Sequence, residues 1–357
     1  MIRKSLIFIL SAALLCGLFA GCAAGNAGAD VHVFYYTYSD TYVSTVRAAL
    51  DKKLTDAGIP YQDYDSNNSQ TTQTEQVQTA ITKGAKVLVV NVVTTGSDDA
   101  AAGIVALARN ADIPVIFFNR EVSDGVVKSY DKCVFVGTDA TEAGKLQGDM
   151  IGDYLVKNYE KTDLNGDGKI SYVLFMGEKG NSEAIYRTHY SVENANKKLT
   201  AAGKPELVFY DSANGDKYLA DREGKWSAQA ANEYMTTALT GYNAAGNNMI
   251  ELIICNNDNM AEGAITALQT AGYNTGASGS VTVPVFGVDA IDAAKELIRS
   301  GKMAGTVTQD GNAMAECIRR AVENGLKGAS LLENMGDYTV DADVAKVRIR
   351  YGVYTGE

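Results

Sequence analysis

The stretch DLNGDGKISYVLFMGEKGNSEAIYR, residues 163–187, joins an acidic loop, an apolar run and a polar cluster. The loop places oxygen-bearing side chains at alternate positions, Asp163, Asn165 and Asp167, and has Gly168 at the sixth position. This spacing is typical of loops that wrap a hard cation such as Ca²⁺, because a glycine at that place allows the sharp turn. The sequence therefore predicts a calcium loop.

The rest of the ligand set departs from an EF-hand. Lys169 at position seven can supply only its backbone carbonyl, and Ser171 at position nine offers a hydroxyl. An EF-hand has a bidentate glutamate at position twelve, but this chain has Leu174 there, inside the apolar run 172–176. We expect a strand after the loop, with the missing carboxylate supplied from elsewhere. The alternative is an acidic surface turn that holds no metal.

Apolar strands alternate with helical segments on both sides of this stretch. The expected strands include VHVFYY (31–36), KVLVVNVV (86–93), IPVIFFN (113–119), CVFVGTD (133–139), IELIICNND (250–258), VPVFGVD (283–289) and MAGTVTQD (303–310). Strands that are apolar throughout belong to parallel sheets covered by helices on both faces. With 357 residues, the chain is long enough for two domains. The sequence predicts an α/β protein with two doubly wound parallel sheets.

Polar side chains gather where these strands end. They are Asp40, Asn119, Glu183, Arg187, Asn257, Asp289 and Gln309. Ligands of open parallel sheets bind at the carboxyl ends of the strands, and carboxylates, amides and one guanidinium exchange hydrogen bonds with hydroxyl groups. Trp226 and Tyr42 add rings that can stack on the C–H face of a sugar. This set predicts a site for a neutral polyol.

Each of these residues also has a purely structural interpretation. Asp40 and Asp289 precede helices and would serve as N-caps, while Asn119 and Asn257 would fit turns and Trp226 a core. Their joint position at strand ends favours a binding site.

Nothing in the sequence matches a catalytic motif. There is no G-x-S-x-G, H-E-x-x-H or P-loop pattern. Asp40 and Asp289 are the carboxylate pair to suspect for glycoside hydrolysis, which leaves a secreted carbohydrate-active enzyme as an alternative. We expect a binding protein that is not an enzyme.

The N-terminus predicts export. Arg3 and Lys4 precede an apolar segment, and small residues lead to Cys22, so that residues 1–21 read as a signal peptide. The sequence FAGC resembles a bacterial lipobox, which predicts acylation of Cys22 and a tether over residues 22–30. An ordinary cleaved signal is the alternative. The formal net charge of -11 makes nucleic acid a poor partner, and the membrane is expected to be contacted through the lipid anchor only.

The chain resembles the bacterial galactose/glucose-binding proteins, type I receptors of ABC sugar importers. The matching segments are IPVIFFNRE, SYDKCVFVGTD, LQGDMIGDYL, DLNGDGKI, IICNNDNMAEGA, VPVFGVDA and AGTV. The resemblance implies a structural Ca²⁺ site completed by Glu251, a permease partner and, in some members, a chemoreceptor or sensor kinase. It implies that the sugar contacts are Asp40, Tyr42, Asn119, Asn181, Glu183, Arg187, Trp226, Asn257, Asp289 and Gln309.

Four of these positions depart from the family's pattern. Tyr42 replaces phenylalanine, Asn181 replaces histidine, Glu183 replaces aspartate and Gln309 replaces asparagine, while Ser171 in the metal loop replaces a glutamine. A monosaccharide such as galactose or glucose is expected. A pentose or an autoinducer-type furanose remains an alternative.

The resemblance also implies two domains joined by three crossings. The first would comprise residues 31–138 and 309–346, and the second residues 139–308 and 347–357, with the calcium loop. The crossings would lie near 137–139, near 308–311 and before Val347. The domains would close on the ligand by a hinge motion.

Overall fold

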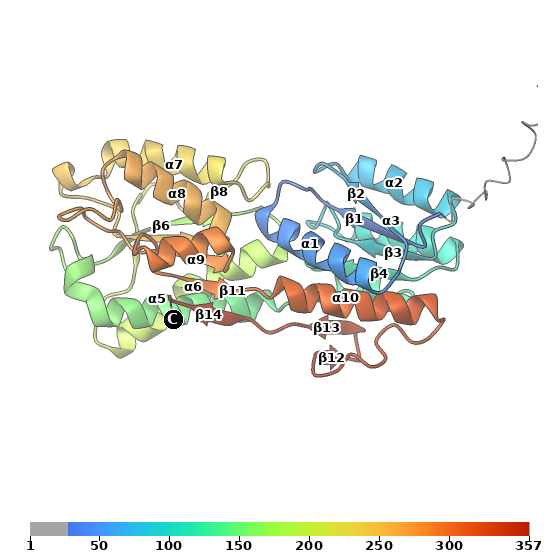
Figure 1. Cartoon of the computed structure of the whole chain (residues 1–357). Coiled ribbons are helices and arrows are strands. Elements are labelled where there is room, and N and C mark those ends of the chain that lie inside the picture. The colour runs from blue at the N-terminus through green and yellow to red at the C-terminus, as the bar shows by residue number, and fades with distance from the viewer. Residues whose placement is uncertain (1–27, 357) are drawn as a thin grey trace, which may run out of the picture.

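The computed structural model describes residues 28–356 and forms two α/β domains side by side (Figure 1). The signal peptide, Cys22 and most of the tether lie outside these residues. Over residues 28–356, no helix combines the length and the apolar character that a membrane span requires.

The first domain is built on a seven-stranded sheet with the order β12-β13-β5-β4-β3-β1-β2. All pairs are parallel except β12–β13. The strands are β1 (Val31–Tyr35), β2 (Tyr61–Asp65), β3 (Val87–Val90), β4 (Val115–Phe118), β5 (Cys133–Gly137), β12 (Thr339–Asp341) and β13 (Lys346–Arg348). The helices are α1 (Thr41–Asp56), α2 (Gln70–Thr82), α3 (Asp99–Asn110), α4 (Asp124–Lys128) and α10 (Gly311–Leu326).

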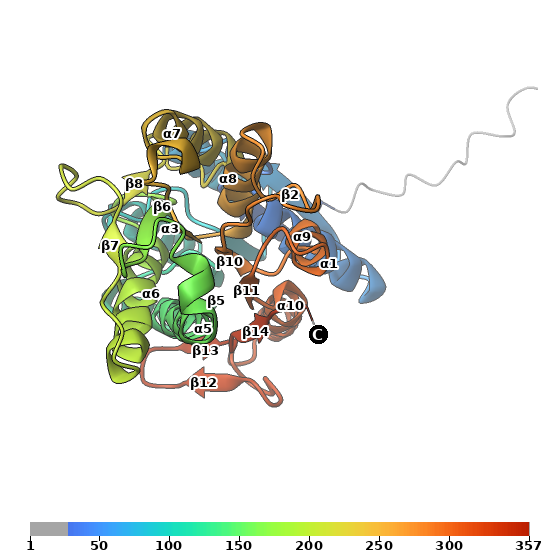
Figure 2. The same ribbon diagram turned by 90° about the vertical axis from the view of Figure 1, so that its left-hand side faces the viewer.

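The second domain repeats this plan with the order β14-β11-β10-β9-β6-β7, and β8 also pairs with β6. The strands are β6 (Ser171–Met176), β7 (Val208–Phe209), β8 (Leu219–Ala220), β9 (Leu252–Cys255), β10 (Val285–Asp289), β11 (Gly305–Thr308) and β14 (Gly352–Tyr354). The helices are α5 (Ala140–Thr162), α6 (Ser182–Ala201), α7 (Ala228–Gly241), α8 (Asp258–Thr270), α9 (Asp292–Arg299) and the 3₁₀ turn η1 (Ala244–Gly246). Figure 2 shows α7 and α8 on one side of this sheet and α5 and α6 on the other.

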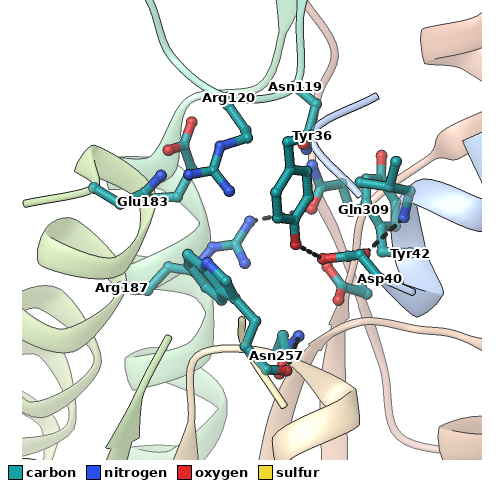
Figure 3. A pocket seen from close by; sticks show the side chains of 13 residues that line it. Tyr36, Asp40, Tyr42, Asn119, Arg120, Glu183, Arg187, Asn257 and Gln309 are labelled. Carbon is teal, nitrogen blue, oxygen red and sulfur yellow. Dashed lines mark hydrogen bonds between the residues drawn. The ribbon is translucent and has the colours of Figure 1, made fainter. Parts of the chain in front are cut away.

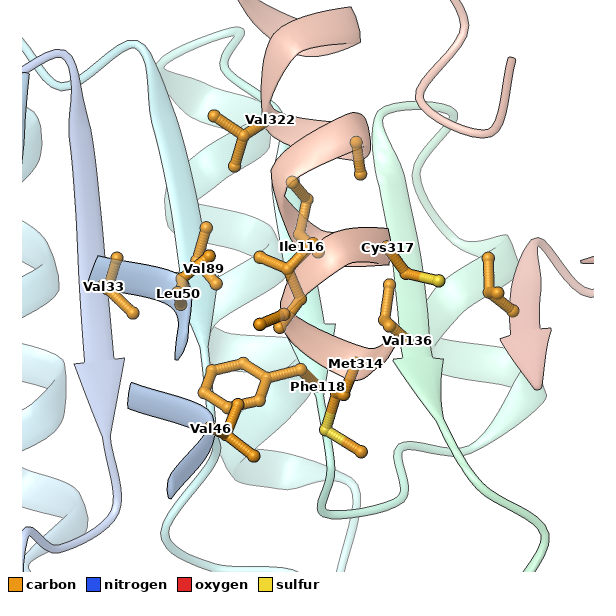
Figure 4. Packing of buried hydrophobic residues seen from close by; sticks show 14 of the residues in the cluster. Val33, Val46, Leu50, Val89, Ile116, Phe118, Val136, Met314, Cys317 and Val322 are labelled. Carbon is orange, nitrogen blue, oxygen red and sulfur yellow. The ribbon is translucent and has the colours of Figure 1, made fainter. Parts of the chain in front are cut away.

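Both faces of each sheet are buried, which explains the unbroken apolar strands. In β4, Ile116 and Phe118 belong to the core beneath α1 and α10, where Met314 and Cys317 pack against the sheet (Figure 4). Val115 and Phe117 belong to the opposite core, beneath α2 and α3. Successive side chains of a strand point to opposite faces, so a doubly covered strand must be apolar at every position. The predicted fold class is confirmed.

Edge strands lack this pattern. β2, with the sequence YQDYD, pairs with β1 alone and is only partly buried. Its polar composition is the reason that the expected series of strands did not include it.

The chain crosses between the domains at residues 138–139, 309–310 and 349–351. The first two crossings lie where we expected them, but the third does not lie before Val347. β13 pairs with β5 through Arg348, and only β14 joins the second sheet, beside β11. The sequence VRIRYGVY reads as one continuous strand, and its division between two sheets depends on partners that its own pattern does not specify.

A pair of carboxyl groups between α1 and β2 makes stability depend on pH. Burial, together with the adjacent Asp51 carboxylate, raises the pKa of Asp63 to about 8. One oxygen of each carboxyl group is buried without a hydrogen-bond partner. A folded-state pKa above the unfolded value contributes stability at low pH that is lost as the pH rises through the folded value.

We therefore expect the free energy of unfolding to fall between about pH 4 and pH 8, and Asp63→Asn to weaken this fall. At pH 8 the variant should be more stable than the wild type by about 1 kcal/mol or more, since one pKa unit corresponds to about 1.4 kcal/mol. Urea denaturation at pH 5 and pH 8 measures both effects. The exposed Asp131→Asn is the matched control, and equal behaviour of the two variants would refute the assignment.

Candidate functional site

A cavity lies between the domains, where the carboxyl ends of both sheets face each other (Figure 3). Its empty space, including solvent at the mouth, is about 370 Å³. All ten residues that we predicted as ligand contacts line it. The lining residues are Tyr36, Asp40, Tyr42, Val43, Asn119, Arg120, Asn181, Glu183, Arg187, Trp226, Asn257, Asp289 and Gln309.

Asp40 is both an N-cap and a wall of the cavity. One carboxylate oxygen accepts the Val43 N–H at 2.8 Å and thereby caps α1. The other accepts the hydroxyl of Tyr36 at 2.5 Å. The structural and the binding interpretations of this residue are thus compatible, because each oxygen has two lone pairs.

Asn119 and Arg120 follow β4 on the same wall. Asn119 has a left-handed backbone (φ 62°), which asparagine tolerates better than most residues, and its side-chain oxygen accepts from Asn91 at 3.1 Å. Arg120 lies over the ring of Tyr36, with the guanidinium carbon 4.2 Å from the ring centre. Arg120 lines the cavity, and its Nε is buried without a protein partner.

On the opposite wall, Trp226 depends on a glycine. A Cβ at Gly177 would lie 2.0 Å from the indole ring, so only glycine permits this packing. Trp226 is 7% exposed and has a left-handed backbone (φ 55°). Its carbonyl accepts from Asn257 and Asn259 at 3.3 and 3.1 Å. These contacts fix the indole as a wall of the cavity.

The N-terminal part of α6 carries two buried charges into the cavity. Arg187 donates to the carbonyl of Asn256 at 2.9 Å and to the side-chain oxygen of Gln309 at 3.1 Å. Burial raises the pKa of the Glu183 carboxyl, and the negative charge of Glu121 adds to the rise. The Nε of Arg187 and one Glu183 oxygen have no protein partner. Buried polar atoms without partners are costly, so this pair suits a ligand that supplies hydrogen bonds.

Burial also raises the pKa of the Asp289 carboxyl, against the pull of the Arg187 charge. Asp289 ends β10 with an unusual backbone (φ 122°), and the next residue, Ala290, is left-handed (φ 56°). Such backbone conformations persist where the surrounding structure enforces them, often at ligand sites.

The protein itself bridges the two walls. Arg120 of the first domain contacts Glu178 of the second at 2.5 Å. The backbone N–H of Glu121 donates to Glu183 at 3.0 Å, and Asn181 donates to the hydroxyl of Thr95 at 3.1 Å. These three contacts hold the two domains against each other beside the cavity.

Tyr36, Val43 and Arg120 were absent from the predicted set. Arg120 directly follows Asn119, and Tyr36 closes the strand that leads to Asp40, so their neighbours carried the only signal. In the sequence, Tyr36 looks like one more residue of an apolar strand. Its hydroxyl meets Asp40 only because the chain turns at residues 37–40.

The expected metal loop is an exposed turn closed by its own acceptors. Asp163 accepts three backbone N–H bonds, from Gly166, Asp167 and Gly168. The fully buried Glu251 accepts from the N–H groups of residues 164, 165 and 171. The loop and the residue expected to complete it therefore do meet.

The hydroxyl of Ser171 is directed at its neighbours. It donates to the carbonyl of Met249 at 2.9 Å and lies 3.2 Å from the Glu251 carboxylate. Within residues 28–356, no group of three or more His, Cys, Asp or Glu side chains is assembled to hold a metal ion. The donor chemistry of the loop nevertheless suits a hard cation, because it combines carboxylates, the Asn165 amide and the Lys169 carbonyl.

Residues 31–329 match the sequence profile of the periplasmic binding protein domain. The D-galactose/methyl-galactoside-binding periplasmic protein MglB of Haemophilus influenzae is 36% identical over 317 residues, which cover 88% of this chain and 87% of that protein. The ribose import binding protein RbsB of the same organism is 25% identical over 300 residues, covering 84% and 86%.

Solved structures share the fold. A solute-binding protein of an ABC transporter from Clostridium phytofermentans, crystallised with β-D-glucose, superposes with a TM-score of 0.71 at 21% identity. The match covers 91% of this chain and 94% of the other.

The contact between Gly177 and Trp226 is open to a direct test. We expect Gly177→Ala to displace the indole, to shift its fluorescence emission to longer wavelength and to destabilise the protein by about 1–3 kcal/mol, as overpacking does. Trp226 is the single tryptophan of the chain, so the emission reports on this site alone. Gly215→Ala is the matched control, because an added Cβ there meets nothing within 4 Å. Unchanged emission in Gly177→Ala would contradict the packing.

Proposed function

Because the chain belongs to the periplasmic binding protein family, whose members are binding proteins outside the cytoplasm and not enzymes, we propose that it delivers a monosaccharide to an ABC importer. The proposed ligand is a hexose of the galactose/glucose class, held between the two domains. The observation that carries this proposal is the cavity between the domains, which carboxylates, amides, guanidinium groups and the largely buried Trp226 line together. The 36% identity to a galactoside-binding relative supports the same class.

The charges around the cavity disfavour an anionic ligand. Asp40, Glu183 and Asp289 face Arg120 and Arg187, and Arg120 is already paired with Glu178. An anionic ligand would add to this excess of negative charge in a buried place, which is strongly unfavourable. Sugar hydroxyls can donate to the carboxylates and accept from the guanidinium N–H groups, and the indole offers a flat face to the sugar ring.

Two of the substituted positions use part of their capacity to hold the domains together. The Asn181 oxygen caps α6 through Ala184, and its nitrogen donates to Thr95. One Glu183 oxygen accepts from Glu121 across the cleft, so its second oxygen is the one left for the ligand. We infer that Asn181 and Glu183 can offer a hexose fewer hydrogen bonds than free amide and carboxylate groups would, because part of each side chain is already bonded to the protein.

We further propose a structural calcium site formed by Asp163, Asn165, Asp167 and Glu251, with the backbone carbonyl of Lys169. Ca²⁺ would neutralise the carboxylates of Asp163, Asp167 and Glu251 and would link the loop to the start of β9. Ser171 acts in this proposal by orienting Glu251. Acylation of Cys22 and engagement of a chemoreceptor or sensor kinase complete the proposed role in the cell.

The sugar proposal is tested by calorimetry and Trp226 fluorescence with galactose, glucose, ribose and arabinose. We expect saturable binding of a hexose. Asp289→Asn should weaken it about 10–100-fold, because a hydrogen bond to a charged group contributes about 1.5–3 kcal/mol. The exposed Asp292→Asn, three residues further on, should bind as the wild type does. Binding of pentoses alone would move the substrate class, and no heat with any sugar would refute the proposal.

The calcium proposal predicts that millimolar Ca²⁺ raises the melting temperature relative to chelator, since a ligand that binds only the folded state stabilises it. Asp163→Ala should remove most of this rise, although it lowers the melting temperature in chelator as well because three backbone N–H groups lose their acceptor. The exposed Asp343→Ala should keep the full rise. An identical rise in all three proteins would exclude this loop as the metal site.

A further inference from the structure

The three crossing segments meet at one hydrogen-bonded cluster beneath the cavity. Thr138 comes from the first crossing, Gln309 from the second and Tyr351 from the third. The hydroxyls of Thr138 and Tyr351 lie 2.7 Å apart, and the Gln309 amide nitrogen lies 3.5 Å from the Thr138 hydroxyl. All three side chains are buried.

This cluster holds the guanidinium of Arg187. One terminal nitrogen of Arg187 donates to the Tyr351 hydroxyl at 3.0 Å and to the Gln309 oxygen at 3.1 Å. The other donates to the carbonyl of Asn256 at 2.9 Å. The Nε of the same side chain is buried without a protein partner, and Arg187 is one of the residues that line the ligand cavity. A single planar group therefore connects the cavity to the crossings.

We propose that Tyr351 is a positioning residue for sugar binding: it holds Arg187 in its binding orientation and, through Thr138 and Gln309, ties that orientation to the angle between the domains. The inference rests on the proposed role of Arg187 as a sugar contact.

The position of Tyr351 in the chain explains how Arg187 is coupled to the hinge motion. Tyr351 lies between β13 of the first sheet and β14 of the second, while Arg187 is on α6 of the second domain. A hinge motion changes the backbone angles of the crossing segments, so it moves the Tyr351 hydroxyl relative to Arg187. The hydrogen bonds observed here belong to the closed arrangement. By linkage, a ligand that fixes Arg187 favours closure, and closure favours the ligand.

A structural role can be separated from this one, because the Tyr351 ring and hydroxyl contribute differently. The ring packs in the core of the second domain. Tyr351→Phe keeps that packing and removes only the hydroxyl, which leaves Arg187 and Thr138 each without one partner. Tyr354→Phe is the matched control, since Tyr354 also bonds an arginine, Arg299 at 3.4 Å, but at the surface of the same terminal segment.

We expect Tyr351→Phe to weaken hexose binding about tenfold by calorimetry, with the Tyr354→Phe protein indistinguishable from the wild type. Arg187→Lys should weaken binding further. Adding Tyr351→Phe to it should then have little additional effect, because the two residues act as a unit. Equal affinity of the two phenylalanine variants, or additive losses in the double variant, would overturn the inference.

A second measurement does not depend on the sugar. Spin labels at Gln78→Cys on α2 and Glu233→Cys on α7 report the distance between the domains. Without ligand, Tyr351→Phe should broaden the distance distribution towards longer values, while Tyr354→Phe should leave it unchanged. If the wild type binds no sugar, the proposed function fails and this distribution alone decides the inference. An unchanged distribution in Tyr351→Phe would then overturn it.

Discussion

A guanidinium group buried between two domains constrains much of this structure. Removing a charge from water is costly unless hydrogen bonds replace the solvent, and Arg187 is only 4% exposed. Its partners come from the end of β9, from the crossing after β11 and from the crossing before β14. The hydrogen bonds of this one side chain therefore connect α6 to the second sheet and to two of the crossings. The same side chain lines the cavity and keeps its Nε without a protein partner, so that a stabilising network and a candidate binding site share one residue.

Sequence patterning revealed the fold because the doubly covered sheets leave little choice of composition. A strand such as β4 must be apolar at every position, and polar side chains are therefore displaced to its carboxyl end, at Asn119. The same rule placed Asn257 and Asp289. It fails at the margins of the sheets, where β2 is a polar edge strand and where the third crossing divides one alternating stretch between two sheets. Sheet membership at those places follows from tertiary partners and not from the local pattern.

The sequence was sufficient to predict most residues of the candidate site, but not which of their atoms are left free to bind a ligand. Glu183 could be named from its position at a strand end and Asn181 from the family resemblance, yet only the structure indicates that part of each side chain is engaged by Thr95 or Glu121 across the cleft. Arg120, in contrast, was not predicted although it lines the cavity. Its neighbour Asn119 signals the site, whereas its own role depends on Glu178, 58 residues away in the other domain. Contacts between domains leave no periodic pattern in the sequence, so the pattern of apolar and polar residues does not predict them.

These contacts across the cleft also determine how residue types relate to affinity. An ion pair such as Arg120–Glu178 and the Glu121–Glu183 hydrogen bond exist only when the domains are closed, so they lower the free energy of closure without touching a ligand. The apparent affinity of a ligand is its intrinsic affinity multiplied by the fraction of protein in the closed form. Substitutions at the cleft can therefore change affinity while the sugar contacts stay the same. A family whose members bind different polyols on one fold can vary both quantities independently: the groups left free for the ligand, and the contacts that hold the walls together.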